Sequence, residues 1–227
     1  MPTRYALYFT PAPGAFQTKA AQWLGWDSDA GQSVPHPDLA GVPEPIPTLT
    51  ETPRKYGFHG TLKAPFRLAA DQTETALIDA LDTFAATRQS ATIGGLKVAA
   101  LGRFLALIPD GDATQLADLT ADIVTFFEPF RAPLSDADIA KRRASGLTPA
   151  QDALMLKWGY PYVMDEFRFH MTLTGALAPE AVATLTPILR AHFADVLTAP
   201  FRIDALSLLT EEDDGRFHLA RRIGLGR

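Results

Sequence analysis

The pattern Phe-His-any residue-Thr-Leu occurs twice in this sequence, as FHGTL and again as FHMTL. In an extended strand the side chains at positions i and i+2 share a face, so His59 projects with Thr61 and His170 with Thr172. One neutral imidazole can take a proton from water while a protonated partner gives one to a departing alkoxide. Threonine hydroxyls can donate to non-bridging phosphate oxygens. The residues therefore predict cleavage of a phosphodiester without a metal ion.

Three other interpretations of the paired motifs stay open. A duplication could have copied a strand whose His and Thr only hydrogen-bond each other. A metal site is the second, although catalytic zinc usually takes three protein ligands. The chain has no cysteine and offers only Asp165 and Glu166 at a suitable offset from a motif. The third is a non-catalytic module that holds a nucleotide or phosphosugar, but binding alone does not require two titratable bases. We predict no metal and no cofactor.

Two cations next to the motifs are candidate substrate-binding residues. Lys63 continues the alternation of His59 and Thr61, and Arg168 shares the face of His170. Both side chains could therefore neutralise an anionic substrate, and a solvated strand end is the equally open alternative. The cationic run at 141–143 follows an acidic helix start, and the pattern predicts a solvated helix face there.

The chain has five histidines, and three of them lie outside the two motifs. We interpret His36, His192 and His218 as structural or surface residues. His36 lies in a proline-rich segment and has one alternative role, as part of a lid that closes over the substrate.

The elements that must position the motifs begin with a strand at 4–9, followed by a helix over 14–25 that carries apolar residues at helical spacing. Six prolines between 34 and 53 fix backbone angles and remove hydrogen-bond donors. That segment is predicted to be a long loop leading into the first motif.

The segments after the two motifs have the same order of predicted elements. After the first motif we expect a helix over 71–89 with Asp71 as its N-cap, then strands at 92–101 and 102–109 joined near Gly102. After the second, the expected elements are a strand at 167–175, a helix at 179–197 that Pro187 kinks or splits, and strands at 201–210 and 215–223.

This order indicates an internal duplication, with repeats at approximately 57–109 and 166–223. The segment between them, approximately 112–160, is predicted to be a helical insert. Two of its helices start with a capping residue followed three positions later by an acid or amide. One domain, 1–227, is expected to contain all of these parts.

Composition excludes several classes of protein. The chain has 227 residues, of which 47% are hydrophobic, so it can bury a core in one large domain or two packed lobes. A formal net charge of -5 argues against tight binding of a long nucleic acid. The absence of cysteine excludes disulfides and a thiol nucleophile. No leader pattern or long apolar run is present, so we expect a cytoplasmic protein without a membrane partner.

The two motifs, set within strand-helix-strand-strand halves, resemble the 2H phosphoesterase superfamily over nearly the whole chain. The segments KYGFHGTLKAPF, LTPAQDALMLKWGYPY and FRFHMTLTG are more specifically similar to a bacterial branch associated with phosphonate metabolism. The resemblance implies an α+β fold that is bilobal, with antiparallel sheets around a central cleft. It also implies His59, Thr61, His170 and Thr172 as the cleft residues.

The function that the resemblance implies is a metal-independent cyclic phosphodiesterase. Its expected partner is a small ribose-type cyclic phosphate, such as a phosphoribosyl 1,2-cyclic phosphate. A phosphodiesterase or ligase acting on a nucleoside or RNA-end 2',3'-cyclic phosphate is the alternative. The acidic balance favours the small substrate, and so do the proline-rich segment and the helical insert, which could narrow the cleft. Which histidine is the acid, the oligomeric state, and any role of the insert as a lid are not assigned by the sequence.

Overall fold

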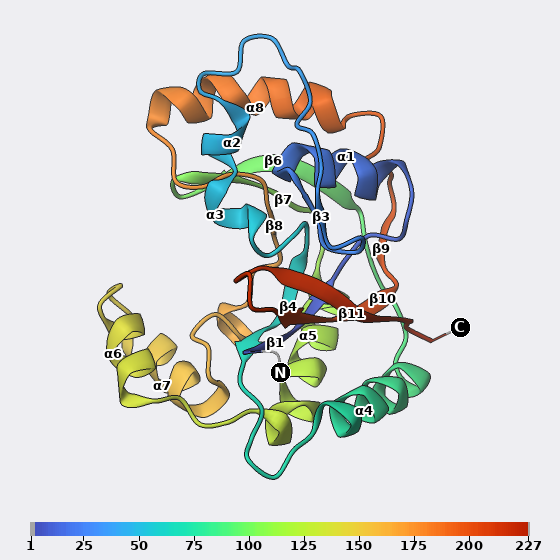
Figure 1. Ribbon diagram of the computed structural model, residues 1–227, viewed down its shortest axis with the longest axis vertical. Helices are drawn as coiled ribbons and strands as arrows, with labels where there is room; N and C mark the ends of the chain where they lie inside the picture. The colour runs from blue at the N-terminus through green and yellow to red at the C-terminus, as the bar shows by residue number, and fades with distance from the viewer. Residues whose placement is uncertain (1–2, 227) are drawn as a thin grey trace.

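Seven strands form the main sheet of the protein, a computed structural model of which describes residues 3–226 (Figure 1). The strands in chain order are β1 Tyr5–Phe9, β2 Trp26–Asp27, β3 Gln32–Ser33, β4 Gly60–Phe66, β5 Ala91–Ile93, β6 Gly95–Leu101, β7 Phe104–Asp110, β8 Met171–Thr172, β9 Phe201–Ile203, β10 Ala205–Glu211 and β11 Phe217–Gly224. The main sheet has the order β11-β10-β1-β4-β8-β7-β6, and each neighbouring pair is antiparallel. The pairs β2-β3 and β5-β9 are separate.

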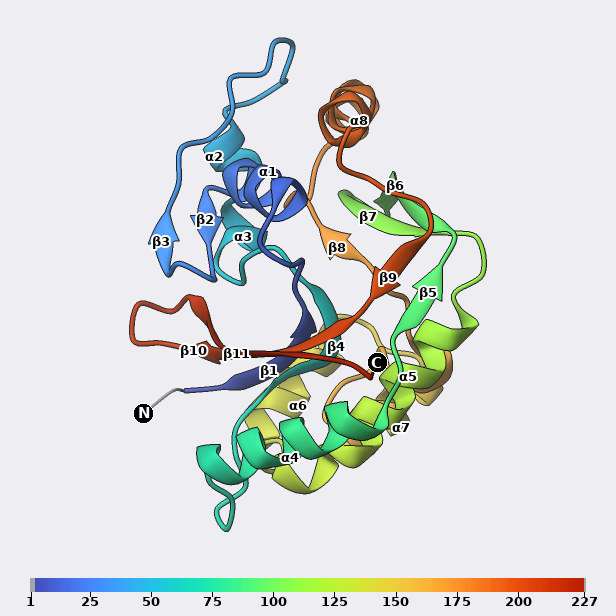
Figure 2. The same cartoon turned by 90° about the vertical axis from the view of Figure 1, so that its right-hand side faces the viewer.

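The helices form two groups, one in the upper half and one in the lower half of the views in Figures 1 and 2. They are α1 Ala15–Leu24, α2 Ile46–Leu49, α3 Glu51–Arg54, α4 Glu74–Thr87, α5 Thr114–Phe126, α6 Asp136–Arg143, α7 Pro149–Trp158 and α8 Pro179–Phe193, with 3₁₀ helices η1 Glu128–Phe130 and η2 Met164–Glu166. Figures 1 and 2 place α1, α2 and α8 at the top and α4 to α7 at the bottom. The expected mixed α and β class with antiparallel sheets is confirmed.

One order of elements occurs twice along the chain. It runs β4, α4, β5, β6, β7 and then β8, α8, β9, β10, β11. The strands mix in space, because β10 and β11 join β1 and β4 while β6 and β7 join β8. In addition β5 pairs with β9. Neither set of elements therefore builds its side of the sheet alone.

The start of the chain follows its sequence pattern, and the proline-rich segment does not. The strand β1 and the helix α1 lie where they are expected. The end of the segment expected to be a loop instead forms two single-turn helices, α2 and α3. Pro47 occupies the first turn of α2, where a missing N–H costs nothing.

Helix starts in the insert are confirmed, and one earlier start is wrong. Capping boxes at Ser135 and Thr148 begin α6 and α7. Helix α4 starts later than Asp71 predicts, because Thr73 is the N-cap and its hydroxyl accepts from the backbone N–H of Ala76. The helix α8 runs through Pro187 without being split.

Two predicted strands have different bounds in the structure. The segment 92–101 divides into β5 and β6, which pair with different partners. The segment 167–175 contains only the two-residue strand β8. A strand this short is held because it lies between β4 and β7 and pairs with both.

The register of β1 with β4 contains a bulge that changes which side chains share a face. Leu7 pairs with Lys63, but its neighbour Tyr8 pairs with Thr61. Strand β4 therefore has one extra residue between these pairs, and the alternation of side chains is reset there. As a result Thr61 shares a face with Tyr8, while Lys63 shares the opposite face with Leu7.

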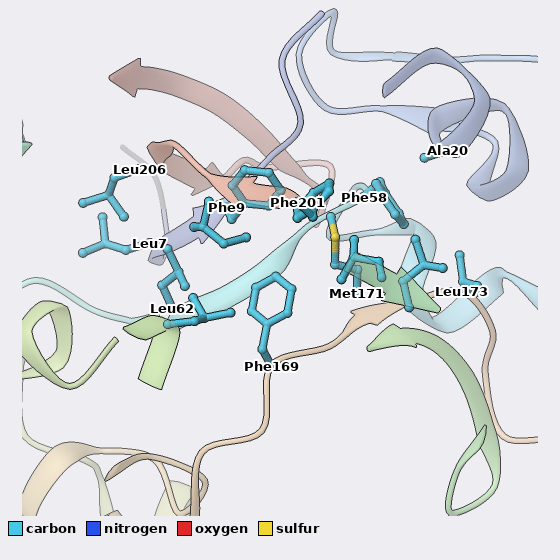
Figure 3. Packing of buried hydrophobic residues seen from close by; sticks show 14 of the residues in the cluster. Leu7, Phe9, Ala20, Phe58, Leu62, Phe169, Met171, Leu173, Phe201 and Leu206 are labelled. Atoms are coloured by element: carbon cyan, nitrogen blue, oxygen red, sulfur yellow. The ribbon is translucent and has the colours of Figure 1, made fainter. Parts of the chain in front are cut away.

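A continuous apolar core lies behind the two histidine motifs. Phe58, Leu62, Phe169, Met171 and Leu173 are all buried in it. Figure 3 shows these side chains packed together beside the motif strands. This arrangement confirms that each motif strand has an apolar back, and it leaves the histidines and threonines on the other side.

Candidate active site

The antiparallel pairing of β4 with β8 brings the two histidine motifs together. Gly60 lies directly opposite Met171. The same register, taken one residue further in each direction, sets His59 opposite Thr172 and Thr61 opposite His170. Opposite side chains have Cβ atoms about 4.5–5.5 Å apart, and diagonal ones about 7–8 Å. The four polar side chains therefore form a rectangle on one face, with the two histidines at diagonal corners.

The middle residues of the motifs hold the two strands close on the other face. A Cβ atom on Gly60 would collide with the ring of Phe169. The glycine is therefore required by the approach of a buried aromatic ring from the second motif.

Both histidines make the same hydrogen bond two residues back along their own chain. His59 Nδ1 lies 2.9 Å from the carbonyl oxygen of Gly57, and His170 Nδ1 lies 2.8 Å from that of Arg168. A carbonyl only accepts, so each Nδ1 must carry the proton in these bonds. In the neutral tautomer each Nε2 then has a free lone pair. The two rings are prepared in the same way for proton transfer.

Gly57 is required by the backbone that supplies the first of these carbonyls. Its φ is 69°, in the left-handed region, and a Cβ atom there would lie 2.6 Å from the hydroxyl oxygen of Ser28. A larger residue would therefore meet both strain and a clash. The turn that carries Gly57 fixes the acceptor for His59.

His59 is covered by aromatic rings. The ring of Tyr8 stacks on it with centroids 3.8 Å apart and planes 21° from parallel, and Tyr56 lies at 5.9 Å. Burial lowers the pKa of His59 to about 4, the bond to Gly57 opposes this, and the charge of His170 adds a smaller downward effect. His59 is therefore neutral near pH 7 and is suited to accept a proton.

Two adjoining cavities open beside the rectangle. His59, Thr61 and Thr172 line the first, the His59 cavity, which has a volume of about 270 Å³. His170 and Thr61 line the second, the His170 cavity, of about 460 Å³. Tyr160, together with Ala64, lines both cavities. All four motif residues therefore reach space that a small molecule could occupy.

The face predicted for Lys63 is wrong. The bulge in β4 turns this side chain away from Thr61, and it is 3% exposed. Its ammonium donates to Glu128 Oε2 at 2.8 Å and to the backbone carbonyl of Val124 at 3.1 Å. Lys63 therefore fixes α5 and η1 against the sheet rather than facing either cavity of the histidines.

Arg168 lies where its alternation predicts. It is exposed and lines the His170 cavity together with His170. Its backbone carbonyl is also the acceptor for His170. A role in substrate binding remains a prediction for this side chain.

Sequence reasoning missed the arginine and tyrosine side chains of the His59 cavity. They are Arg4, Tyr8, Tyr56, Arg142 and Tyr160. The run at 141–143 was expected to be a solvated face, and that is wrong for Arg142, which is partly buried and lies over the ring of Tyr160 at 5.1 Å. For Tyr8 the sequence did contain a signal, because side chains alternate along the first strand and Tyr8 therefore shares a face with Ala6. Arg4 lies directly before β1, and Tyr56 lies in the turn before β4. Arg142 and Tyr160 belong to the insert, whose fold the motifs do not determine.

The three remaining histidines line neither cavity. His36 Nδ1 lies 3.0 Å from the backbone carbonyl of Trp23, which ties the proline-rich segment to α1. His218 lies 3.3 Å from Asp214 within the last hairpin. His192 packs against Trp23 and Phe193 at the end of α8. Their positions agree with structural or surface roles.

Residues 3–226 contain neither a candidate metal cluster nor a candidate membrane-spanning helix. No group of three or more His, Cys, Asp or Glu side chains there is arranged to hold a metal ion. Of the two acidic residues near the second motif, Glu166 accepts from the side chain of Gln151 at 2.9 Å. Within the same residues, none of the helices has the length and apolar character needed to cross a bilayer.

Comparison with known proteins identifies one family and several relatives. The family model described as "Protein of unknown function (DUF1045)" matches residues 61–218. A protein named "Ribose 1,5-bisphosphate phosphokinase PhnN" from Janthinobacterium sp. (strain Marseille) is 39% identical over 219 residues, which cover 94% of this chain and 48% of that protein. Its namesake from Laribacter hongkongensis (strain HLHK9) is 33% identical over 225 residues, covering 98% and 52%. The chain thus spans about half the length of these curated relatives.

Solved structures with a similar arrangement are more distant in sequence. One is described as a phosphoesterase, with 14% identity and a TM-score of 0.43 over 100% of both chains. Another is LigT of E. coli complexed with NADP+, with 15% identity and a TM-score of 0.43 over 100% of this chain and 99% of that one.

Proposed function

The chain belongs to the family described as "Protein of unknown function (DUF1045)", and we propose from the chemistry of its site that it is a metal-independent cyclic phosphodiesterase acting on a small ribose-type cyclic phosphate. The observation that carries the proposal is the register of β4 with β8. Gly60 opposite Met171 sets two imidazoles and two hydroxyls on one face, beside two cavities. The duplication of the motif segments and a central cleft formed by these cavities are part of the same proposal.

His59 is the general base in this proposal. Its Nε2 takes a proton from water as the water oxygen bonds to phosphorus, which its neutral state near pH 7 allows. Protonated His170 gives its proton to the leaving ribose oxygen as the P–O bond breaks. Thr61 and Thr172 donate to the non-bridging oxygens. The product is a phosphomonoester, and proton exchange with solvent returns both histidines to their starting states.

The name of the curated relatives supports a phosphorylated ribose as the substrate class. That name includes ribose 1,5-bisphosphate, and the matched segment is about half of each relative. The kinase reaction in the same name is not part of our proposal. Many kinases bind phosphate with a loop that ends in Gly-Lys followed by Ser or Thr, and the present sequence contains no Gly-Lys pair. An association with phosphonate metabolism, through the resemblance noted above, remains part of the proposal.

A second candidate substrate is a nucleoside 2',3'-cyclic phosphate. The His170 cavity favours it, because Phe104, Tyr160, Tyr162 and Phe167 present aromatic surface there. Aromatic side chains stack on nucleobases with little sequence preference. The reacting five-membered cyclic phosphate would be the same for both substrates, so the steps assigned to the histidines and threonines do not change.

The direct test is a turnover screen of cyclic phosphates in excess chelator, followed by phosphorus NMR. We expect turnover with chelator present, and a loss of about 10²–10⁴-fold in His59→Ala and in His170→Ala. His218→Ala is the matched control, because His218 also follows a Phe but lines neither cavity.

Two results would contradict the proposal. Activity that disappears in chelator and returns with a divalent ion would indicate a metal site. Tight binding of a phosphosugar that survives both alanine substitutions, with no turnover of any cyclic phosphate, would indicate a non-catalytic binding module.

A further inference from the structure

Besides the threonine hydroxyls, five potential donors to an anion line the same cavity as His59. They are the guanidinium groups of Arg4 and Arg142 and the hydroxyls of Tyr8, Tyr56 and Tyr160. Arg4 lies directly before β1 and Tyr8 lies within it, Tyr56 lies in the turn before β4, and Arg142 and Tyr160 lie before and after α7. Segments far apart in the sequence therefore contribute the same kind of group to one space.

The three phenol hydroxyls form no hydrogen bond with another protein group among residues 3–226, although Tyr8 is only 1% exposed. Burial is the main reason that the pKa of Tyr8 and that of Tyr160 are raised, so both hydroxyls keep their protons. Neighbouring phenols add to the upward shift at each, and an arginine opposes it. The hydroxyls of Tyr8 and Tyr160 therefore remain potential donors, and both side chains line the His59 cavity together with Arg4 and Arg142.

Arg142 supplies positive charge that the described protein leaves without a salt bridge. Within residues 3–226 it forms no salt bridge, whereas the next residue, Arg143, lies 2.7 Å from Asp152. Arg4 differs, because it makes two bonds of 2.7 Å to Glu211 and its charge is largely offset. Of the two guanidinium groups of the cavity, Arg142 is therefore the one without a carboxylate at salt-bridge distance among the described residues, and it is positioned by its contact with the face of Tyr160.

The positive charge of Arg142 is more than the cyclic phosphate needs for neutralisation of its own charge. A cyclic phosphodiester carries one negative charge, and two histidines and two threonines already surround its proposed position. A phosphomonoester carries close to two charges and several acceptor oxygens, and guanidinium groups bind such oxygens in pairs. A substrate with a separate phosphomonoester could therefore bind the arginine and tyrosine donors as well. A substrate with only the cyclic phosphate would leave most of them without a partner.

We propose that Arg142, with Arg4 and the hydroxyls of Tyr8, Tyr56 and Tyr160, binds a terminal phosphomonoester of the substrate, distinct from the cyclic phosphate that reacts. The inference rests on the proposed function and narrows its substrate class to sugars that carry both groups. Arg142 is the specificity-determining residue of this subsite.

The test compares two substrates that differ only in the terminal group. Uridine 2',3'-cyclic phosphate and its 5'-phosphorylated form are assayed with the unmodified protein, Arg142→Ala, Arg142→Lys and Lys141→Ala. Lys141 is the matched control, since it is exposed on the same helix and lines neither cavity. We expect Arg142→Ala to raise KM for the 5'-phosphorylated substrate by about 10- to 100-fold. Values for the other substrate and for Lys141→Ala should stay unchanged. Arg142→Lys should keep part of the preference and shows that the fold is intact.

Equal losses for both substrates would overturn the proposal, because Arg142 would then act on the reacting phosphate. Absence of a preference in the unmodified protein would overturn it as well. A separate binding arm uses ribose 5-phosphate against ribose in calorimetry. If neither cyclic phosphate is turned over, the proposed function fails. In that case, ribose 5-phosphate binding that Arg142→Ala removes would still support the subsite, and no binding by the unmodified protein would refute it.

Discussion

The ring of Tyr8 lies flat on the imidazole of His59, with 3.8 Å between ring centroids. Tyr8 is itself buried, so this contact keeps water from one face of the histidine. The contact gives a physical origin for the low pKa of His59, for which burial is the main cause. In the proposed reaction, the pH dependence of turnover should therefore respond to changes in the contact between Tyr8 and His59.

We expect the acid limb of kcat/KM to lie near pH 4, because His59 must be neutral to act as a base and its pKa is lowered to about 4. Tyr8→Ala admits water to the ring, raises the pKa of His59 toward its ordinary value and moves the limb to higher pH. Tyr8→Phe keeps the stacking and is the control, assayed with a substrate lacking a terminal phosphate. An acid limb that stays in place in Tyr8→Ala would show that another group controls it.

The stability of the protein should also depend on pH through His59. Its pKa falls from 6.5 in an unfolded chain to about 4 in the fold, so the unfolded state binds more protons between these values. The contribution is fully present above pH 6.5 and is lost as the pH falls toward 4, by roughly 3 kcal/mol at most. Urea unfolding of the unmodified protein and of His59→Gln over this range measures it. Identical slopes in the two proteins would contradict the burial of His59.

Lys63→Met should reduce stability while leaving the chemistry intact. The substitution removes the ammonium that pairs with Glu128, although Arg131 still contacts that carboxylate. We expect a loss of roughly 1–3 kcal/mol in the free energy of unfolding, with kcat/KM nearly unchanged. Lys97→Met is the control, because its pair with Asp110 is exposed and should contribute less than about 1 kcal/mol. A large loss of kcat/KM in a folded Lys63→Met protein would restore a substrate-binding role.

Gly60→Ala should destabilise the fold through one clash. The new methyl group meets the ring of Phe169, which is buried and has little room to move. We expect a cost of about 1–3 kcal/mol, measured by thermal or urea unfolding. Adding Phe169→Leu should recover part of it, so that the double variant loses less than the two single losses added together. Strictly additive losses would rule out the contact as the reason for the glycine.

The sequence predicted the elements around the motifs well because their signals are local. Capping boxes in the insert and the alternation within each motif depend on residues a few positions apart. The errors come from longer-range contacts. The bulge that turns Lys63 depends on how β4 fits β1, and the shortness of β8 depends on β4 and β7 at its two sides.

The candidate site likewise has a part that local patterns predicted and a part that they did not. The pattern of the motifs identified the four polar residues, but it carried no information on what surrounds them. Arg142 comes from a cationic run that resembles any solvated helix face, and only the packing of α6 beside Tyr160 turns it toward the cavity. A residue that reaches the site only through tertiary packing has no characteristic spacing in the sequence, so no local pattern could have identified it.

The placement of β8 between β4 and β7, and of β10 beside β1, has a consequence for biosynthesis. A ribosome releases the first histidine and its strand long before the strands that flank them have been made. Until then the nascent chain exposes unpaired edges at β1 and β4, a situation in which chaperones commonly engage a protein. Activity should therefore appear abruptly, once the last hairpin has left the exit tunnel, rather than grow as translation proceeds.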